Sequence, residues 1–164
     1  MSETFRGAEP FGILFLCTAN SARSILSEFA LNDLAGPDSG VRAYSAGSHP
    51  KAAPNRIALA LLRREGMDVS GARSKGWEVF SEPGAPRIDL VLTVCDAAAG
   101  ESCPLYPGSP VKAHWGVPDP HSEADFEQAY RVLRDRCARL LALKPATLSR
   151  EALSAAAVQL GRPA

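Results

Sequence analysis

Residues 12–30, GILFLCTANSARSILSEFA, decide the fold of this chain. A continuous apolar run ends at Cys17, small and polar residues follow, and an apolar pattern of helical spacing begins near Arg23. This order predicts a buried parallel strand, a tight loop and a helix. The N-terminus of a helix attracts anions and stabilises a thiolate. The stretch therefore predicts an oxyanion site in which Cys17 is the nucleophile and Arg23 binds the anion with paired donors.

The rest of the chain repeats this alternation of strand and helix. Apolar runs at 41–45, 88–94 and 111–115 predict further strands, and helical patterns begin at Pro54, Ser122 and Ser149. Residues 75–80 are expected to form one or two helical turns. The alternation is typical of a doubly wound α/β domain with a parallel sheet of about four strands and helices on both faces. Because parallel strands end at the same edge, we expect Cys17, Cys95 and Trp115 at one edge, where such sheets bind ligands.

Composition narrows the possible functions. The chain has 164 residues with 18 basic and 18 acidic side chains, and zero net charge gives no support to nucleic-acid or membrane binding. No transmembrane segment or signal peptide is predicted, so we expect a cytoplasmic location. In a reducing compartment the four cysteines indicate chemistry rather than structural disulfides. We expect a monomer with a flexible lead-in at 1–10, a catalytic domain at 11–145 and a C-terminal helix appended at 146–164.

Asp119 follows the last predicted strand and precedes Pro120. A carboxyl group at this edge can protonate an oxygen that leaves the anion, or it can simply begin a turn. Cys137 lies on the apolar stripe of the long helix predicted after Ser122, so we expect it in the core.

The remaining cysteines do not indicate a metal site. Cys95 and Cys103 are too far apart in sequence for the short pairs of zinc sites. The three histidines show no ligand spacing either. Cys95 and Cys103 are therefore either two buried thiols or a redox-active pair.

The sequence CTANSARS at 17–24 resembles the anion-binding loop of the low-molecular-weight protein tyrosine phosphatase superfamily, and Asp119-Pro120 resembles its general-acid loop. The C-T-x-N-S-x-R-S variant, with a cysteine pair downstream, is more similar to the arsenate reductases of that superfamily. The likeness runs from about Gly12 to about Leu143. It implies a flavodoxin-like fold with strand order 2-1-3-4. It also implies one oxyanion site, built by Thr18, Ala19, Asn20, Ser21, Ala22, Arg23 and Ser24.

The resemblance further implies a thiol relay that converts arsenate to arsenite and confers arsenical resistance. Cys17 attacks arsenic, Asp119 protonates the departing oxygen, Cys95 attacks Cys17, and Cys103 then forms a disulfide with Cys95. An external thiol reductant, thioredoxin or a glutaredoxin/glutathione system, resets that disulfide. No tightly bound cofactor or metal is implied, and phosphate and sulfate are expected competitors of arsenate.

Several residues are expected to support the loop. Asn20 tolerates the left-handed backbone that a tight loop needs, and Ser45 is a candidate hydrogen-bond partner for it. Ser24 is expected to hydrogen-bond the thiolate. In some reductases of the family an acidic residue near the position of Lys75 forms an alkali-metal site with residues that correspond to Asn20 and Glu28. Here the ammonium of Lys75 takes the place of the cation, or Lys75 is a solvated surface lysine.

Two alternative functions stay open at this point. A low-molecular-weight phosphotyrosine phosphatase would use Cys17, Arg23 and Asp119, with water resolving a phosphocysteine. However, His121 and Ser122 follow the acid loop where such phosphatases typically have tyrosines, and hydrolysis leaves Cys95 without a role. The alternative from another class is a non-catalytic sensor of oxyanions.

Overall fold

The computed structural model describes residues 9–101 and 104–163, and a parallel sheet forms its centre. The strands are β1 (Phe11–Cys17), β2 (Val41–Gly47), β3 (Leu90–Thr93) and β4 (Val111–His114). Their order is β2-β1-β3-β4 and every pairing is parallel. The helices are α2 (Arg23–Ala35), α3 (Arg56–Arg64), η1 (Trp77–Ser81), α4 (Asp96–Ala99), α5 (Glu123–Ala142), η2 (Pro145–Thr147) and α6 (Arg150–Leu160). The predicted fold class and strand order are confirmed.

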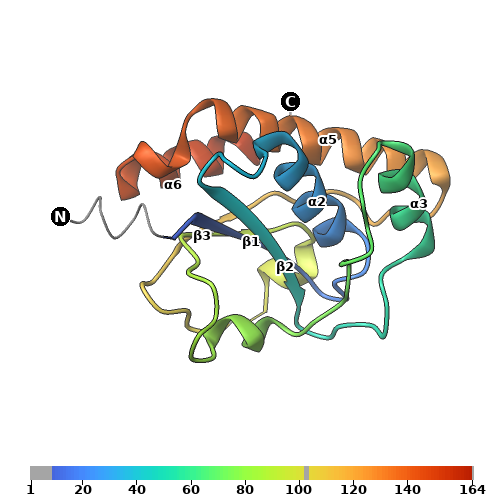
Figure 1. Cartoon of the computed structure of the whole chain (residues 1–164), viewed down its shortest axis with the longest axis horizontal. Helices are drawn as coiled ribbons and strands as arrows, with labels where there is room; N and C mark the ends of the chain where they lie inside the picture. The colour runs from blue at the N-terminus through green and yellow to red at the C-terminus, as the bar shows by residue number, and fades with distance from the viewer. Residues whose placement is uncertain (1–8, 102–103, 164) are drawn as a thin grey trace.

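The two faces of the sheet are covered unequally. Helices α2, α5 and α6 lie over one face, as Figure 1 shows, and α3 packs on α2 and α5. The opposite face is covered by η1, drawn in green, and by neighbouring loops that contribute Phe80, Ile88 and Tyr106. The predicted helical turn at 75–80 is thus a 3-10 helix.

Strand β1 lies at the centre of the core. All of its side chains are buried, with Ile13 and Phe15 in the cluster that faces α5 and α6. Leu14 and Leu16 belong to the cluster on the other face. Because side chains alternate along a strand, burial on both faces requires an unbroken apolar run, which is the pattern seen in the sequence.

Capping residues set where the helices begin. The Ser122 hydroxyl accepts from Asp125 N–H and the Asp125 carboxylate accepts in return, which forms a capping box at the start of α5. Ser149 caps α6 as predicted. Helix α3 begins at Arg56, not at the predicted Pro54, because the Asn55 side chain accepts from the N–H groups of the first turn.

Trp115 joins α6 to the sheet. It is fully buried, its ring centroid lies 6.1 Å from that of Phe15, and its Nε1 donates to the Ala157 carbonyl at 2.8 Å. The C-terminal helix is therefore packed into the same core as the strands.

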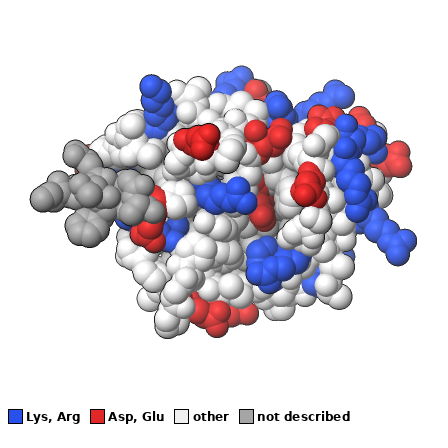
Figure 2. Space-filling view, in the orientation of Figure 1, with Lys and Arg blue, Asp and Glu red and all other residues white. Residues whose placement is uncertain are grey.

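Residues 1–8 of the expected lead-in lie outside the described residues. Among the described helices, none is long and apolar enough to cross a bilayer. On the face shown in Figure 2, basic and acidic side chains are interspersed, without a large field of one sign.

Candidate active site

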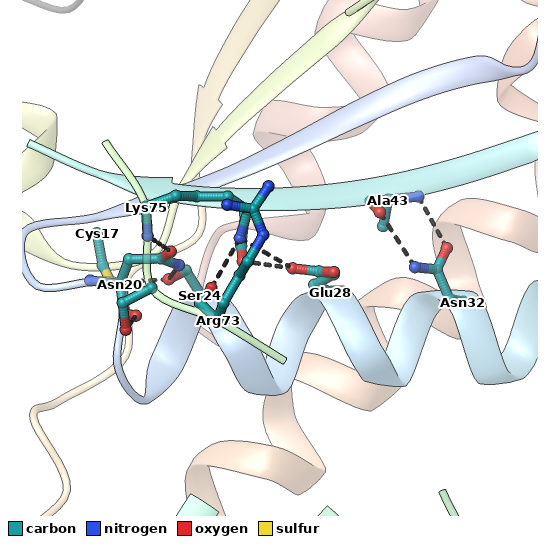
Figure 3. Close-up of polar contacts among 10 residues, drawn as sticks. Cys17, Asn20, Ser24, Glu28, Asn32, Ala43, Arg73 and Lys75 are labelled. Carbon is teal, nitrogen blue, oxygen red and sulfur yellow. Dashed lines mark hydrogen bonds and ion pairs between the residues drawn. The ribbon is translucent and has the colours of Figure 1, made fainter. Parts of the chain in front are cut away.

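The anion loop is folded around Asn20. Its backbone is left-handed, with φ at 47°, as the sequence predicts. Its N–H donates to Cys17 Sγ at 3.2 Å, and its Nδ2 donates to Ser24 Oγ at 2.8 Å. Ser24 Oγ in turn lies 2.9 Å from Cys17 Sγ (Figure 3). The expected contact between Ser24 and the thiol is confirmed, and Cys17 has two polar partners that can stabilise a thiolate.

The carbonyl groups of the loop are bound from outside. Those of Thr18, Ala19 and Ser21 accept from N–H groups in residues 49–55 at 2.8–3.0 Å. The Asn20 carbonyl accepts from Ser74 Oγ at 2.6 Å. In a trans peptide the N–H points opposite to the carbonyl, so the loop N–H groups point to the concave side. No side chain caps the start of α2, which leaves this concave side to an anion.

Gly47, at the end of β2, lies directly against the loop. A Cβ atom there would lie 2.5 Å from the Thr18 carbonyl oxygen and 2.9 Å from Asn20 N. Both are backbone atoms, so only glycine allows this close approach.

Arg23 and Asp119 meet at the mouth of the loop. Arg23 donates through Nη1 to the Val117 carbonyl at 3.0 Å, and its Nη2 lies 3.4 Å from Asp119 Oδ1. His121 Nε2 lies 3.8 Å from the other carboxylate oxygen of Asp119. The predicted acid is therefore next to the predicted anion-binding arginine, on a loop almost a hundred residues away in sequence.

Cys95 lies beside the anion loop. Its thiol is buried and lies 3.7 Å from Thr18 Oγ1, and it accepts from Ala98 N–H at 3.4 Å as the N-cap of α4. The expectation that Cys17 and Cys95 share one edge of the sheet is confirmed. Cys103 lies outside the described residues.

Three side-chain contacts tie the segment after Cys95 to residues at the ends of β4 and β2. Asp96 Oδ1 lies 2.8 Å from His114 Nε2 at the end of β4. Ser48 Oγ, just after β2, donates to Glu101 Oε1 at 2.7 Å, and His49 Nδ1 lies 3.6 Å from Glu101 Oε2. The short helix α4 is thus attached at both of its ends.

Lys75 and Glu28 form a buried charge pair under the loop. Lys75 Nζ lies 4.0 Å from Glu28 Oε1, and the two side chains are only 12% and 19% exposed. The backbone N–H of Lys75 donates to Asn20 Oδ1 at 2.9 Å (Figure 3). Lys75 is therefore not a solvated surface lysine.

The expected partner of Ser45 is wrong. Its hydroxyl donates to Glu28 Oε1 and not to Asn20. The Asn20 amide is already used by Ser24 and by Lys75 N–H, whereas the buried carboxylate of Glu28 requires a donor.

Burial shifts both members of the pair toward their neutral forms. It raises the pKa of Glu28 above its ordinary value, an effect that Lys75 and then Ser45 oppose. Burial likewise lowers the pKa of Lys75, and the Glu28 carboxylate opposes that shift. Each charge therefore opposes part of the pKa shift that burial imposes on the other.

Cys137 is fully buried on α5 and is a core residue, as predicted; burial strongly raises the pKa of its thiol. In residues 9–101 and 104–163, no group of three or more histidine, cysteine or carboxylate side chains could hold a metal ion.

Three contributors to the site have no clear sequence signal: the Val117 carbonyl, the Ser74 hydroxyl and Glu101. The first is a backbone group, and the other two are common polar residues in irregular segments. Only their tertiary contacts identify them.

Comparison with known proteins agrees with this geometry. Residues 12–154 match the family model described as low molecular weight phosphotyrosine protein phosphatase, and the chain belongs to this family. An arsenate reductase of Halalkalibacterium halodurans is 33% identical over 123 residues, which cover 74% of this chain and 84% of the relative. The family resemblance read from the sequence is confirmed, and this similar relative is an arsenate reductase.

Solved structures show how widely the fold is shared. A thioredoxin-dependent arsenate reductase of Corynebacterium glutamicum superposes with a TM-score of 0.68 at 24% identity, covering 90% of this chain and 68% of that one. A low molecular weight phosphotyrosine phosphatase of Vibrio cholerae superposes with a TM-score of 0.63 at 21% identity, covering 83% of this chain and 95% of that one. The fold alone therefore does not separate reduction from hydrolysis.

We predict that Gly47→Ala damages the anion loop, because the added Cβ would overlap the backbone of Thr18 and Asn20. Phosphate affinity, measured by calorimetry, should fall by about tenfold or more, equal to about 1.4 kcal/mol. Gly71→Ala is the matched control, because a Cβ at Gly71 meets nothing within 4 Å. Equal phosphate affinity in the two variants would contradict this role for Gly47.

We predict that Lys75→Met makes stability depend more steeply on pH through Glu28, whose pKa burial already raises in the wild type. Without the ammonium, the carboxyl pKa rises further above 4.5, so the folded state binds a proton more tightly than the unfolded state. The free energy of unfolding is highest below the ordinary pKa and falls as the pH rises through the raised value. The fall amounts to about 1.4 kcal/mol for each pH unit that separates the folded pKa from the unfolded pKa. Urea unfolding between about pH 5 and 8 measures this slope.

The double variant Lys75→Met/Glu28→Gln is the control, because it contains no titrating carboxyl at this place. Its stability should vary less with pH than that of the single variant, because no carboxyl titrates at this place. A single variant whose stability follows the same pH profile as the double variant would show that the pair is not coupled.

Proposed function

We propose that the protein is an arsenate reductase that uses Cys17 as nucleophile and Cys95 as the second thiol. The observation that carries the proposal is the contact between Thr18 Oγ1 and Cys95 Sγ at 3.7 Å. It brings a second buried thiol next to the loop that holds the first. The names of the curated relatives support the same chemistry.

The first step forms the arsenic–sulfur bond. The loop N–H groups and Arg23 bind arsenate, and Cys17 attacks arsenic while Asp119 supplies the proton with which one oxygen leaves as water. Cys95 then attacks Cys17 Sγ, and the electron pair of the breaking arsenic–sulfur bond reduces arsenic as arsenite departs. A Cys17–Cys95 disulfide results.

The second thiol exchange regenerates Cys17. Cys103 attacks Cys95, which frees Cys17 and leaves a Cys95–Cys103 disulfide that an external dithiol must reduce. Disulfide formation by Cys95 removes its role as N-cap acceptor for Ala98 N–H. Helix α4 spans only Asp96–Ala99, and a helix of one turn has little stability of its own, so its rearrangement costs little.

The external reductant belongs to the same proposal. We expect thioredoxin as the partner, because a structural neighbour is described as thioredoxin-dependent, with glutaredoxin and glutathione as the alternative. Phosphate and sulfate, which share the tetrahedral shape of arsenate, are expected to compete for the loop. As part of the same proposal, we expect the protein to be a monomer in the cytoplasm with no tightly bound cofactor.

Phosphate ester hydrolysis is the second candidate. It would use the same loop, Arg23 and Asp119, and a phosphatase shares the fold. Hydrolysis gives no function to the thiol beside Thr18, so reduction is the better account of this site.

We predict that Cys17→Ser, Cys95→Ser and Cys103→Ser each abolish arsenate turnover. The assay follows NADPH consumption with thioredoxin and its reductase, and in parallel with glutaredoxin and glutathione. Loss of a nucleophile or a relay thiol should lower kcat by about a thousandfold or more. Cys137→Ala is the matched control, because Cys137 is a core thiol away from the loop, and it should retain turnover.

Aryl phosphate hydrolysis by the same variants separates the two candidates. Cys103→Ser with intact arsenate turnover would refute the relay. Efficient hydrolysis of an aryl phosphate by the wild type, without arsenate turnover with either reductant, would establish the phosphatase instead.

We further propose that the Lys75 ammonium replaces an alkali cation beneath the loop, because it lies against Glu28 and its backbone holds Asn20. Exchange of potassium for tetramethylammonium at constant ionic strength should change kcat/KM by less than about twofold. A large loss of rate or of thermal stability in tetramethylammonium would show that the protein still requires the metal.

A further inference from the structure

A groove of about 860 Å³ lies behind the acid loop. Its walls are residues 116–120, one side of α5 and the end of α6, with Val117, Val132 and Leu160 among the apolar lining residues. Its volume is within the range of small-molecule sites. The wall at 159–163 lies beyond the residues that match the family, so the groove depends on a part of the chain outside the shared fold.

Arg136 is the buried charge of this groove. It is only 9% exposed, and its guanidinium donates to the carbonyls of Gly116 and Gly161 at 3.4 and 3.5 Å, both long distances for hydrogen bonds. In the described part of the chain it forms no ion pair within 4.0 Å, although the Asp135 carboxylate on the same helix acts on its charge from farther away. A buried charge without a counter-ion is costly, and an anion that enters the groove would relieve that cost.

Two of the other arginines on the groove walls are already paired with carboxylates. Arg131 lies 3.8 Å from Glu127 and Arg139 lies 3.0 Å from Asp135. Arg162 donates to Gln159 Oε1 at 2.9 Å at the open end. The positive charge that no carboxylate pairs with is therefore at Arg136 and at Arg162, while the carboxylates of Asp119 and Asp125 also line the groove.

We propose that the groove between the acid loop, α5 and α6 binds a small organic carboxylate, with the carboxylate at Arg136 and its apolar body between Val132 and Leu160. A guanidinium offers a planar fork of donors that matches a carboxylate. The apolar walls favour a ligand with a hydrocarbon or aromatic body over a bare inorganic anion.

Such a ligand would also contact the catalytic machinery. Arg136 holds the Gly116 carbonyl from the groove side, and Arg23 holds the adjacent Val117 carbonyl from the anion-loop side. Two arginines thus hold successive peptide groups of the loop that carries Asp119. A carboxylate that binds Arg136 weakens the long hydrogen bond from Arg136 to the Gly116 carbonyl. The position of the loop 116–120 then changes.

The test uses 3-phenylpropanoate as the probe and 3-phenylpropanamide as its neutral counterpart, with the full chain and saturating phosphate to occupy the anion loop. Amide NMR shifts should appear at Gly116, Val117 and Asp119 and in residues 128–136 and 159–162, and be absent from 17–24. The carboxylate should bind about tenfold or more tightly than the amide. Equal binding of the two, shifts confined to the anion loop, or no shifts at millimolar probe would overturn the proposal.

Substitutions in the groove then test which side chains bind the probe. Arg136→Met should lower the affinity for the carboxylate to that of the amide, and Leu160→Glu, which places a negative charge at the rim, should also weaken it. Arg150→Gln, on an exposed arginine of α6 outside the groove, should leave it unchanged. The comparison of acid and amide on the wild type remains decisive if Arg136→Met does not fold. Undiminished binding by Arg136→Met or by Leu160→Glu would refute the site.

Discussion

The left-handed turn at Asn20 is the constraint on which the rest of the site depends. Its backbone turns the chain back toward Cys17, and its side chain joins Ser24 on α2 to the N–H of Lys75. One residue therefore sets the curvature of the loop and ties it to two other segments. Because its own N–H donates to Cys17 Sγ, the same residue also orients the nucleophile.

The loop is suited to bind an anion because its carbonyl groups are occupied elsewhere. Residues 49–55 and Ser74 bind the carbonyls from outside, and Gly47 lets β2 approach closely enough for this. The buried pair of Glu28 and Lys75 lies beneath, where each charge compensates the desolvation of the other. Arg136 differs, because the direct partners of this buried charge are two carbonyl groups and no carboxylate pairs with it, and this difference marks the groove behind the acid loop.

The shared fold explains why one loop is compatible with two chemistries. A tetrahedral oxyanion, a thiolate, an arginine and a carboxylic acid are needed both for hydrolysis and for the first step of reduction. Only the group that next attacks the adduct differs. In this chain the thiol of Cys95 lies at the neighbouring strand end, and the proposed reduction depends on that position.

The sequence by itself determined the strand, loop and helix at 12–30, the alternating architecture, the helix caps at Ser122 and Ser149, and the left-handed Asn20. These features follow from local periodicity, from side chains that bond their own backbone, and from a motif whose spacing is short. Contacts between segments distant in sequence were predicted less well. The Ser45 hydroxyl donates to Glu28 and not to Asn20, because packing brings the Ser24 hydroxyl to the Asn20 amide instead.

Only the tertiary structure decided that the Val117 carbonyl holds Arg23, that Lys75 is buried against Glu28, and that α6 and α5 form a groove around an unpaired guanidinium. The physical reason is common to all three. All three depend on which surfaces pack together: the hydrogen bonds to backbone groups, the desolvation of a charge and the shape of a cavity. Local sequence patterns do not predict these tertiary contacts.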